Sequence, residues 1–248
     1  MMPSLRQTIS FEPIGSVARW SRPQRFDFLH RLPASPIADT ELLHLSHYCP
    51  VVIVATDEGP QVEILLDPAM TAASAVDKDG RWRPPYSPIA LRSLPFWPGA
   101  TSDEIRVAPE LAVERAGENF ALRDSSGDPS EQFALVLTWI ERLRQGMRRL
   151  SEAAKLIVAA DLATPLIINR PGALIPIETE YFTVSFEKLK ALSPMRAAAL
   201  TAGRCLPLDL VAACLFSRRL LARSVALQKV ESVESNFADE SRNELQFI

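Results

Sequence analysis

The sequence predicts an α+β protein in which a proline-rich β lobe in the N-terminal half precedes a helical lobe built on one long helix, about residues 129–161. Thirteen of the 20 prolines fall within residues 1–98, and proline both breaks helices and removes a backbone N–H that a sheet needs. Short strands and turns should therefore dominate that region. An apolar stripe at helical spacing predicts the long helix, and 248 residues that are 47% hydrophobic can form a sizeable core.

The β lobe is assigned residues 1–127. Residues 51–55 and 62–66 are short β-prone runs separated by Thr-Asp-Glu-Gly-Pro, a pattern typical of a hairpin. Residues 77–80, with the sequence Asp-Lys-Asp-Gly, predict a second turn. Further strands are expected at residues 105–107, 111–115 and 120–123.

The long helix opens with an N-cap type residue, Asp128, followed by Pro129 and by Glu131, the layout of a capping box. Every position of the stripe that follows is apolar: Phe133, Val136, Ile140, Leu143, Met147, Leu150, Ala154 and Ile157. Pro165 ends the element, and Gly146 is the one place where it could bend. We interpret the stripe as packing on the chain's own domain, but a coiled-coil seam between two subunits has the same pattern.

The rest of the helical lobe, assigned residues 128–230, contains further predicted elements. Residues 173–184 are rich in Ile, Thr, Tyr and Phe, which predicts extended structure. Residues 186–192 predict a short helix. Pro194 opens another helix, and Pro207 opens a third that is expected to run to about residue 230.

The net charge of −3 gives no indication of a nucleic-acid partner. Residues 231–248 contain five acidic residues and one arginine, and their few large apolar side chains predict a disordered acidic tail. The nine glycines lie at least ten residues apart. This spacing excludes the glycine-rich loops that bind dinucleotides or phosphates and the G-x-S-x-G nucleophile elbow.

Two features predict a cytoplasmic protein. The N-terminus has no apolar stretch typical of a signal peptide, and the apolar run at residues 210–216 is too short to span a membrane. The three cysteines, Cys49, Cys205 and Cys214, form an odd set that is best interpreted as reduced thiols.

Three motifs at similar spacings resemble the SapC family. They are Tyr48-Cys49-Pro50 at the start of a buried strand, the Asp79-Gly80-Arg81-Trp82 turn, and Tyr86-Ser87-Pro88 followed by Arg92-Ser93-Leu94-Pro95-Phe96. Residues 186–189 and 208–217 are similar to the closing helices of that family. Cys49 is a departure, since it separates the usual Tyr-Pro pair.

The resemblance implies an accessory role. SapC-like proteins take their name from surface-layer loci. They often occur beside TonB-dependent receptors, flavin-dependent tryptophan halogenases and cupin-like or prolyl-hydroxylase-like oxygenases. A protein partner from such a system is therefore expected. No catalytic residue and no cofactor follow from the resemblance.

The residues Trp82, Tyr86, Arg92 and Phe96 form the candidate ligand-binding set. Four prolines stiffen the surrounding loop, which reduces the entropy lost when these side chains engage a ligand. The planar guanidinium of Arg92 suits a carboxylate or a phosphate. The alternative is that the aromatic residues anchor the core or loop and Arg92 braces a turn.

His44, His47 and Cys49 form H-x-x-H-x-C, and Glu41 adds E-x-x-H. A zinc site needs three or four ligands, so His30 would have to contribute from another segment. We predict surface histidines and no metal, although whether His44, His47 and Cys49 bind one stays open. In an extended segment His47 also lies too far along the strand to activate the Cys49 thiol.

Arginines cluster on two predicted helices: Arg142, Arg144, Arg148 and Arg149 on the first, and Arg218, Arg219 and Arg223 on the second. A solvated helix face explains them, and the alternative is an acidic partner or the chain's own tail. The function predicted is that of a non-catalytic binding or adaptor protein. The alternatives are an enzyme whose site lies between the lobes and a structural subunit that dimerises through the long helix.

Overall fold

A computed structural model describes residues 9–15, 19–99, 101, 104–112, 119–169, 176–201 and 205–228. It confirms an α+β protein with one long helix. The helices are α1 Leu42–Leu45, α2 Ile89–Arg92, α3 Glu131–Ala159, α4 Phe186–Lys190, α5 Pro194–Thr201 and α6 Leu206–Ser217. The strands are β1 Glu12–Pro13, β2 Arg19–Trp20, β3 Ala34–Pro36, β4 Val51–Thr56, β5 Gly59–Leu65, β6 Phe96–Pro98, β7 Ile105–Val107, β8 Phe120–Ala121, β9 Ala163–Ile168, β10 Ile177–Val184 and β11 Val225–Leu227. The predicted tail, residues 231–248, lies outside the described residues.

The main sheet is antiparallel, with the strand order β11-β9-β10-β4-β5-β3. The predicted hairpin is confirmed as β4 and β5, whose register pairs Val51 with Ile64 and Thr56 with Gly59. The turn at residues 77–80 is also present, with Gly80 at φ +78°. The sheet joins strands from residues 1–127 to strands from residues 128–230, so both halves of the chain build one layer.

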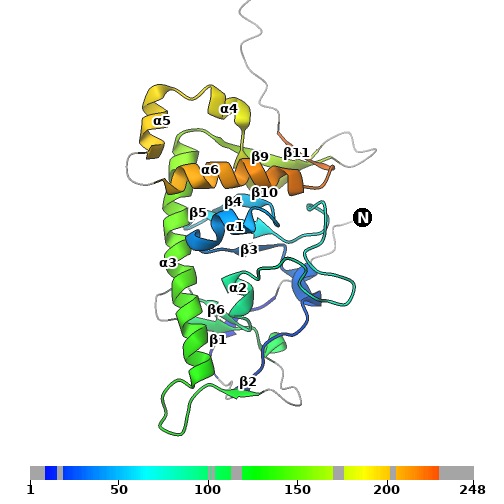
Figure 1. The fold of residues 1–248 in the computed structure, drawn as a ribbon, viewed down its shortest axis with the longest axis vertical. Coiled ribbons are helices and arrows are strands. Elements are labelled where there is room, and N and C mark those ends of the chain that lie inside the picture. The colour runs from blue at the N-terminus through cyan, green and yellow to red at the C-terminus, as the bar shows by residue number, and fades with distance from the viewer. Residues whose placement is uncertain are drawn as a thin grey trace, which may run out of the picture.

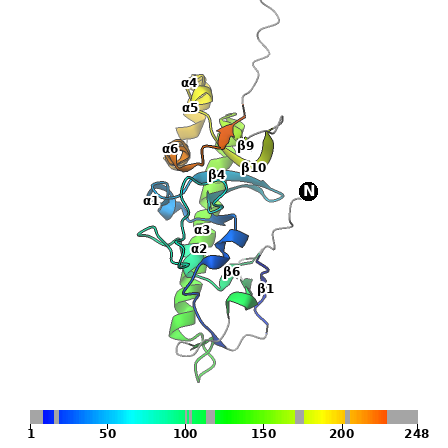
Figure 2. The same cartoon turned by 90° about the vertical axis from the view of Figure 1, so that its right-hand side faces the viewer.

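The helix α3 runs along the long axis of the molecule (Figure 1 and Figure 2). It packs against β5, α6, α2 and β6 of its own chain. The apolar stripe supplies most of its buried residues, which are Val136, Ile140, Leu143, Gly146, Leu150, Ala153, Ala154 and Ile157. The intramolecular interpretation of the stripe is therefore confirmed, and a seam between subunits along this same stripe is excluded.

Gly146 does not break α3. A Cβ placed there would lie 2.5 Å from Cα of Ala38, so the missing side chain lets the segment before α1 approach the helix closely. The start of the helix differs from the prediction, because Ser130 is the N-cap and accepts a hydrogen bond from the backbone N–H of Phe133 at 3.3 Å. The N–H of Asp128 instead donates to the carboxylate of Asp124 in the preceding turn.

Three further expectations need correction. The helix that begins near Pro207 ends at Ser217, a 3-10 turn follows at Arg218–Leu220, and β11 then pairs with β9. The prediction of a strand at residues 111–115 is wrong at its start, because Leu111 ends a 3-10 helix, Pro109–Leu111. Residues 113–115 of that prediction lie outside the described residues. The strand β9 was not predicted, since Pro165 within it argues against a central strand.

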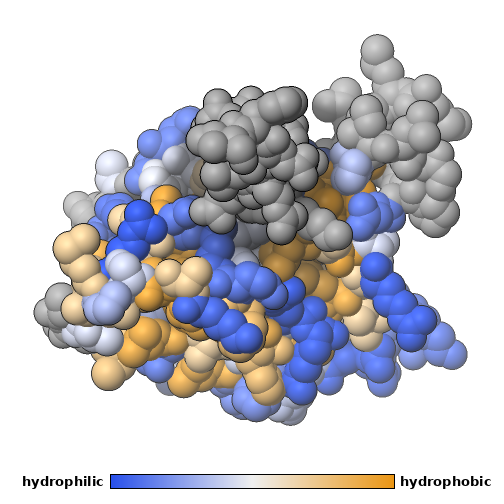
Figure 3. Space-filling view, turned by 90° about the horizontal axis from the view of Figure 1, so that it is seen from above, coloured by the Kyte–Doolittle hydropathy of each residue, from blue (hydrophilic) through white to orange (hydrophobic). Residues whose placement is uncertain are grey.

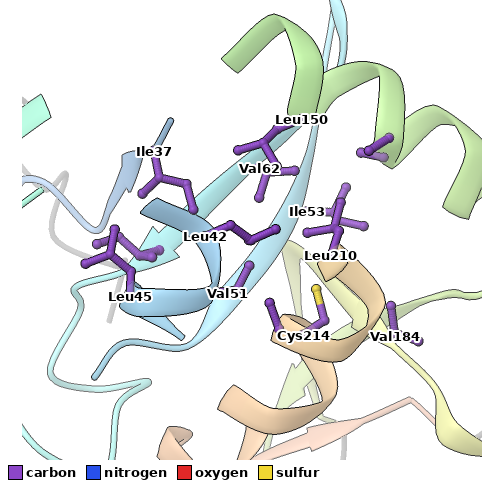
Figure 4. Packing of buried hydrophobic residues seen from close by; sticks show 14 of the residues in the cluster. Ile37, Leu42, Leu45, Val51, Ile53, Val62, Leu150, Val184, Leu210 and Cys214 are labelled. Atoms are coloured by element: carbon purple, nitrogen blue, oxygen red, sulfur yellow. The ribbon is translucent and has the colours of Figure 1, made fainter. Parts of the chain in front are cut away.

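The main core lies between the sheet and α1, α3 and α6 (Figure 4). Val51 and Ile53 of β4 and Val62 of β5 face Leu150 of α3 and Leu210 of α6 in this core. All five side chains are at most 3% exposed. Burial of this kind stabilises the fold by roughly 1.5–3 kcal/mol for each large aliphatic side chain.

The end of the molecule that carries α4 and α5 exposes apolar side chains among charged ones (Figure 3). Met195 of α5 is 80% exposed, and Leu200 is the buried residue of that helix. Among the described residues, no single helix is both long and apolar enough to span a membrane. One pair of segments, Pro194–Thr201 and Leu206–Leu220, has that length and apolar character when taken together, but it is bent by 107°.

Candidate functional site

The structure brings three of the four predicted ligand-binding residues together. Trp82 and Tyr86 lie in the loop before α2, and the indole N–H of Trp82 donates to the backbone oxygen of Tyr86 at 2.8 Å. Arg92 ends α2, and its Nη2 donates to the Tyr86 hydroxyl at 2.9 Å. Phe96 lies apart from them, fully buried, with its ring 5.0 Å from that of Trp20.

Glu41 is the buried centre of this site and was not predicted to belong to it. Its carboxylate is 2% exposed and accepts three hydrogen bonds, from the backbone N–H of Ala38 at 2.9 Å, from the N–H of Ile89 at 2.7 Å and from the Tyr86 hydroxyl at 2.9 Å. These donors replace the water that a buried carboxylate loses. Glu41 thus ties the segment before α1 to the start of α2.

Tyr86 links the carboxylate to the arginine. Its hydroxyl donates to Glu41 and accepts from Arg92, so both the proton and the lone pair of the phenol are used. Partial burial, together with the charge and hydrogen bond of Glu41, raises the pKa of Tyr86 to about 12. The phenol therefore remains protonated at neutral pH, as a donor to Glu41 requires.

Arg92 is held between two aromatic rings. Its guanidinium carbon lies 5.2 Å from the ring centroid of Tyr86 and 5.4 Å from that of Trp139, which α3 supplies. The ring of Trp139 also contacts Arg22, whose guanidinium carbon lies 5.0 Å from its centroid. The residues Glu41, Trp82, Tyr86, Arg92 and Trp139 are called the Arg92 cluster below.

The guanidinium of Arg92 retains hydrogen-bonding capacity. Within the part of the chain that the structure describes, it makes one side-chain hydrogen bond, its buried Nε has no partner, and no carboxylate lies at ion-pair distance. A guanidinium carries five N–H donors in a planar fork that suits a carboxylate or phosphate. The buried Nε is out of reach of another molecule, so an anionic group from outside the chain would have to be bound by the terminal N–H groups of this half-buried side chain.

The histidines and the cysteine of the H-x-x-H-x-C motif lie in different environments. His44 and His47 are exposed, with ring centroids 5.0 Å from Tyr86 and 4.8 Å from Phe216 respectively. Cys49 is buried, and burial raises its pKa to about 12. The described residues contain no group of three or more His, Cys, Asp or Glu side chains placed to hold a metal ion.

Comparisons with known proteins give one match. The family model described as SapC matches residues 16–223, a range that includes the whole Arg92 cluster. No curated protein and no solved structure matches the chain.

Proposed function

The chain belongs to the SapC family, and from this premise and the geometry of the Arg92 cluster we propose that it is a non-catalytic accessory protein that binds a protein partner through an anionic group. The observation that carries the proposal is the half-buried guanidinium of Arg92, which lies over two rings and, among the described residues, makes one hydrogen bond, to the Tyr86 hydroxyl. A carboxylate of the partner is the group that fits it best.

Preorganisation supports recognition at this position. An arginine that is already stacked loses little further side-chain entropy on binding. Arginine, tyrosine and tryptophan are also the residues on which binding energy concentrates in protein interfaces. Glu41 accepts the hydrogen bond of the Tyr86 hydroxyl and thereby acts as the positioning residue of the site.

The nature of the partner follows from what family resemblance implies. We propose a cytoplasmic protein that acts with a component of an envelope-uptake or surface-layer system, such as one served by TonB-dependent receptors, or with an amino-acid-modifying oxygenase or halogenase. A catalytic role for the buried thiols has little support, because burial raises the pKa of both Cys49 and Cys214 to about 12 and the thiolate is the nucleophilic form.

Native mass spectrometry of the full chain, purified from its source cells, tests the proposal, since one spectrum reports partner, small ligand and metal. The key variant is Arg92→Lys, which keeps the charge but loses the planar fork. Its matched control is Arg83→Lys, an exposed arginine of the same loop. We expect Arg92→Lys to weaken the complex about tenfold or more and Arg83→Lys to leave it unchanged.

Two results would overturn the proposal. The first is a complex of unchanged affinity in Arg92→Lys together with a lowered melting temperature, which would make Arg92 a structural brace. The second is a stoichiometric small molecule or metal in place of a protein partner, which would favour an enzyme.

A further inference from the structure

An open groove of about 810 Å³ runs beside α3, separate from the Arg92 cluster. Arg144, Met147 and Arg148 of α3 line one side, and Trp97 of β6 lines another. Lys155 of α3 and, from the β4–β5 hairpin, Glu58 and Gln61 also line it. The strand β5 of this hairpin packs against α3 (Figure 1). This surface is called the Arg148 groove.

The Arg148 groove carries an excess of positive charge in a chain whose net charge is −3. Among the described residues, four basic ones line it, Arg106, Arg144, Arg148 and Lys155, against two acidic ones, Glu58 and Glu152. Lys155 is paired with Glu152 at 2.7 Å, and Arg106 with Glu104 at 2.8 Å.

Arg148 itself is exposed. It forms no ion pair or hydrogen bond with the described residues, unlike its neighbours in the groove. Two members of the arginine cluster on this helix, Arg144 and Arg148, therefore line a groove, and Arg148 has no acidic partner within the described chain.

The groove also offers apolar contact surface. The rings of Phe11 and Trp97 lie 4.9 Å apart and are half-buried, as is Met147 on the facing helix. Flat aromatic surfaces and methionine adapt to apolar side chains of a partner, and such anchors carry much of the energy of protein interfaces.

We propose that the Arg148 groove binds an acidic peptide segment of a partner protein, with a carboxylate at Arg148 and an aromatic or aliphatic side chain on Trp97. Charge complementarity favours an acidic occupant. Glu58 and Glu152 in the same groove disfavour the continuous phosphate backbone of a nucleic acid. The groove is open and elongated along α3, which suits an extended chain. This surface is independent of the one proposed for Arg92.

Fluorescence anisotropy with a labelled synthetic peptide, in which glutamates alternate with phenylalanine and serine, tests the inference on the full chain. Arg148→Glu should weaken binding by about tenfold or more, and Arg148→Ala by severalfold. Arg142→Glu, an equal charge change at an exposed position of the same helix outside the groove, should leave binding within about twofold. Added salt should weaken binding of the unchanged chain. Arg92→Lys should have no effect, which separates this inference from the proposed function.

Four outcomes would overturn the inference. Equal losses in Arg142→Glu and Arg148→Glu would indicate unspecific charge attraction. Equal binding of a peptide with glutamine in place of glutamate would remove the acidic requirement. Tighter binding of an RNA oligonucleotide would indicate a nucleic-acid surface. About tenfold tighter peptide binding after the five acidic residues of 231–248 are changed to amides would make the chain's own terminus the occupant.

Discussion

The Arg92 cluster and the Arg148 groove lie on two flanks of the same helix and use the same residue types. They differ in how many interactions the chain itself makes with their arginines. In the cluster, the guanidinium of Arg92 lies over the rings of Tyr86 and Trp139 and donates to the Tyr86 hydroxyl, which in turn donates to Glu41. In the groove, the guanidinium of Arg148 faces open space. The residue types alone therefore do not distinguish an arginine that the chain itself positions from one that it leaves open, whereas the supply of partners within the chain does.

Replacing Glu41 with Gln should have the largest effect on stability. The amide would place an NH₂ group against one of the three donors that now point at the carboxylate, from Ala38, Ile89 and Tyr86. Breaking such a buried, charge-assisted network should lower the free energy of unfolding by about 3 kcal/mol, measured by urea denaturation.

Glu152→Gln is the matched control for this change. Its side chain is 67% exposed and, among the described residues, pairs with Lys155 three residues away, so the same chemical change should cost less than about 0.5 kcal/mol. Equal losses of unfolding free energy in Glu41→Gln and Glu152→Gln would contradict the distinction between the buried Glu41 of the Arg92 cluster and the exposed Glu152 of the Arg148 groove.

Glu63 extends the comparison to a half-buried carboxylate that accepts no hydrogen bond from the described residues. Burial, and then the charge of Glu180, raise its pKa to about 7 from an ordinary value of 4.5. The folded chain keeps this proton after the unfolded chain has lost it, so stability falls as the pH rises from about 4.5 to about 7, by up to about 3 kcal/mol. Glu63→Gln should remove this decline and be more stable than the unchanged chain at pH 8.

Urea denaturation of both chains across that pH range measures the difference. Glu178→Gln, an exposed carboxylate of β10, is the control and should show the same pH dependence as the unchanged chain. A pH profile of Glu63→Gln that runs parallel to that of the unchanged chain would show that Glu63 is not protonated in the fold.

Tyr86→Phe should have an intermediate effect, because it removes one donor to Glu41 and one acceptor for Arg92 while the ring remains. The expected loss is about 1–2 kcal/mol in the free energy of unfolding. Tyr48→Phe, an exposed phenol, is the control and should be near neutral. Ultraviolet absorbance should show a phenol with a pKa of about 12 that disappears in Tyr86→Phe. If the phenol that is lost in Tyr86→Phe titrated near its ordinary pKa of 10, this result would contradict the hydrogen bond from Tyr86 to Glu41.

The elements with a periodic or local pattern could be predicted from the sequence. Elements that depend on partners far along the chain were harder to predict. The stripe from Phe133 to Ile157 and the hairpin at residues 51–66 follow from local patterns, and both are present. The strand β9 was missed because Pro165 lies within it. This proline is tolerated near the end of the pairing with β11, whose last pair joins Leu227 and Leu166.

The candidate site was predicted in part for a similar reason. Trp82, Tyr86 and Arg92 lie within eleven residues, and their grouping is visible in the sequence. Glu41 and Trp139 come from distant segments and join the site only through the packing of α1, α2 and α3. A weak signal for Glu41 existed, since it lies three residues after Ala38 at the start of a helical turn, where a carboxylate commonly bonds back to the backbone.

The smallest effect on stability is expected at Arg148, and it is the sharpest test of the contrast between the two surfaces. Arg148→Ala removes a side chain that forms no ion pair with described residues, so the free energy of unfolding should change by less than about 0.5 kcal/mol. Arg92→Ala removes a cation stacked on Tyr86 and Trp139 and should cost about 1–2 kcal/mol. Parallel urea denaturation compares the two. If Arg148→Ala destabilised the chain as much as Arg92→Ala, the guanidinium of Arg148 would already be engaged within the fold, and the groove would not be free to bind a peptide.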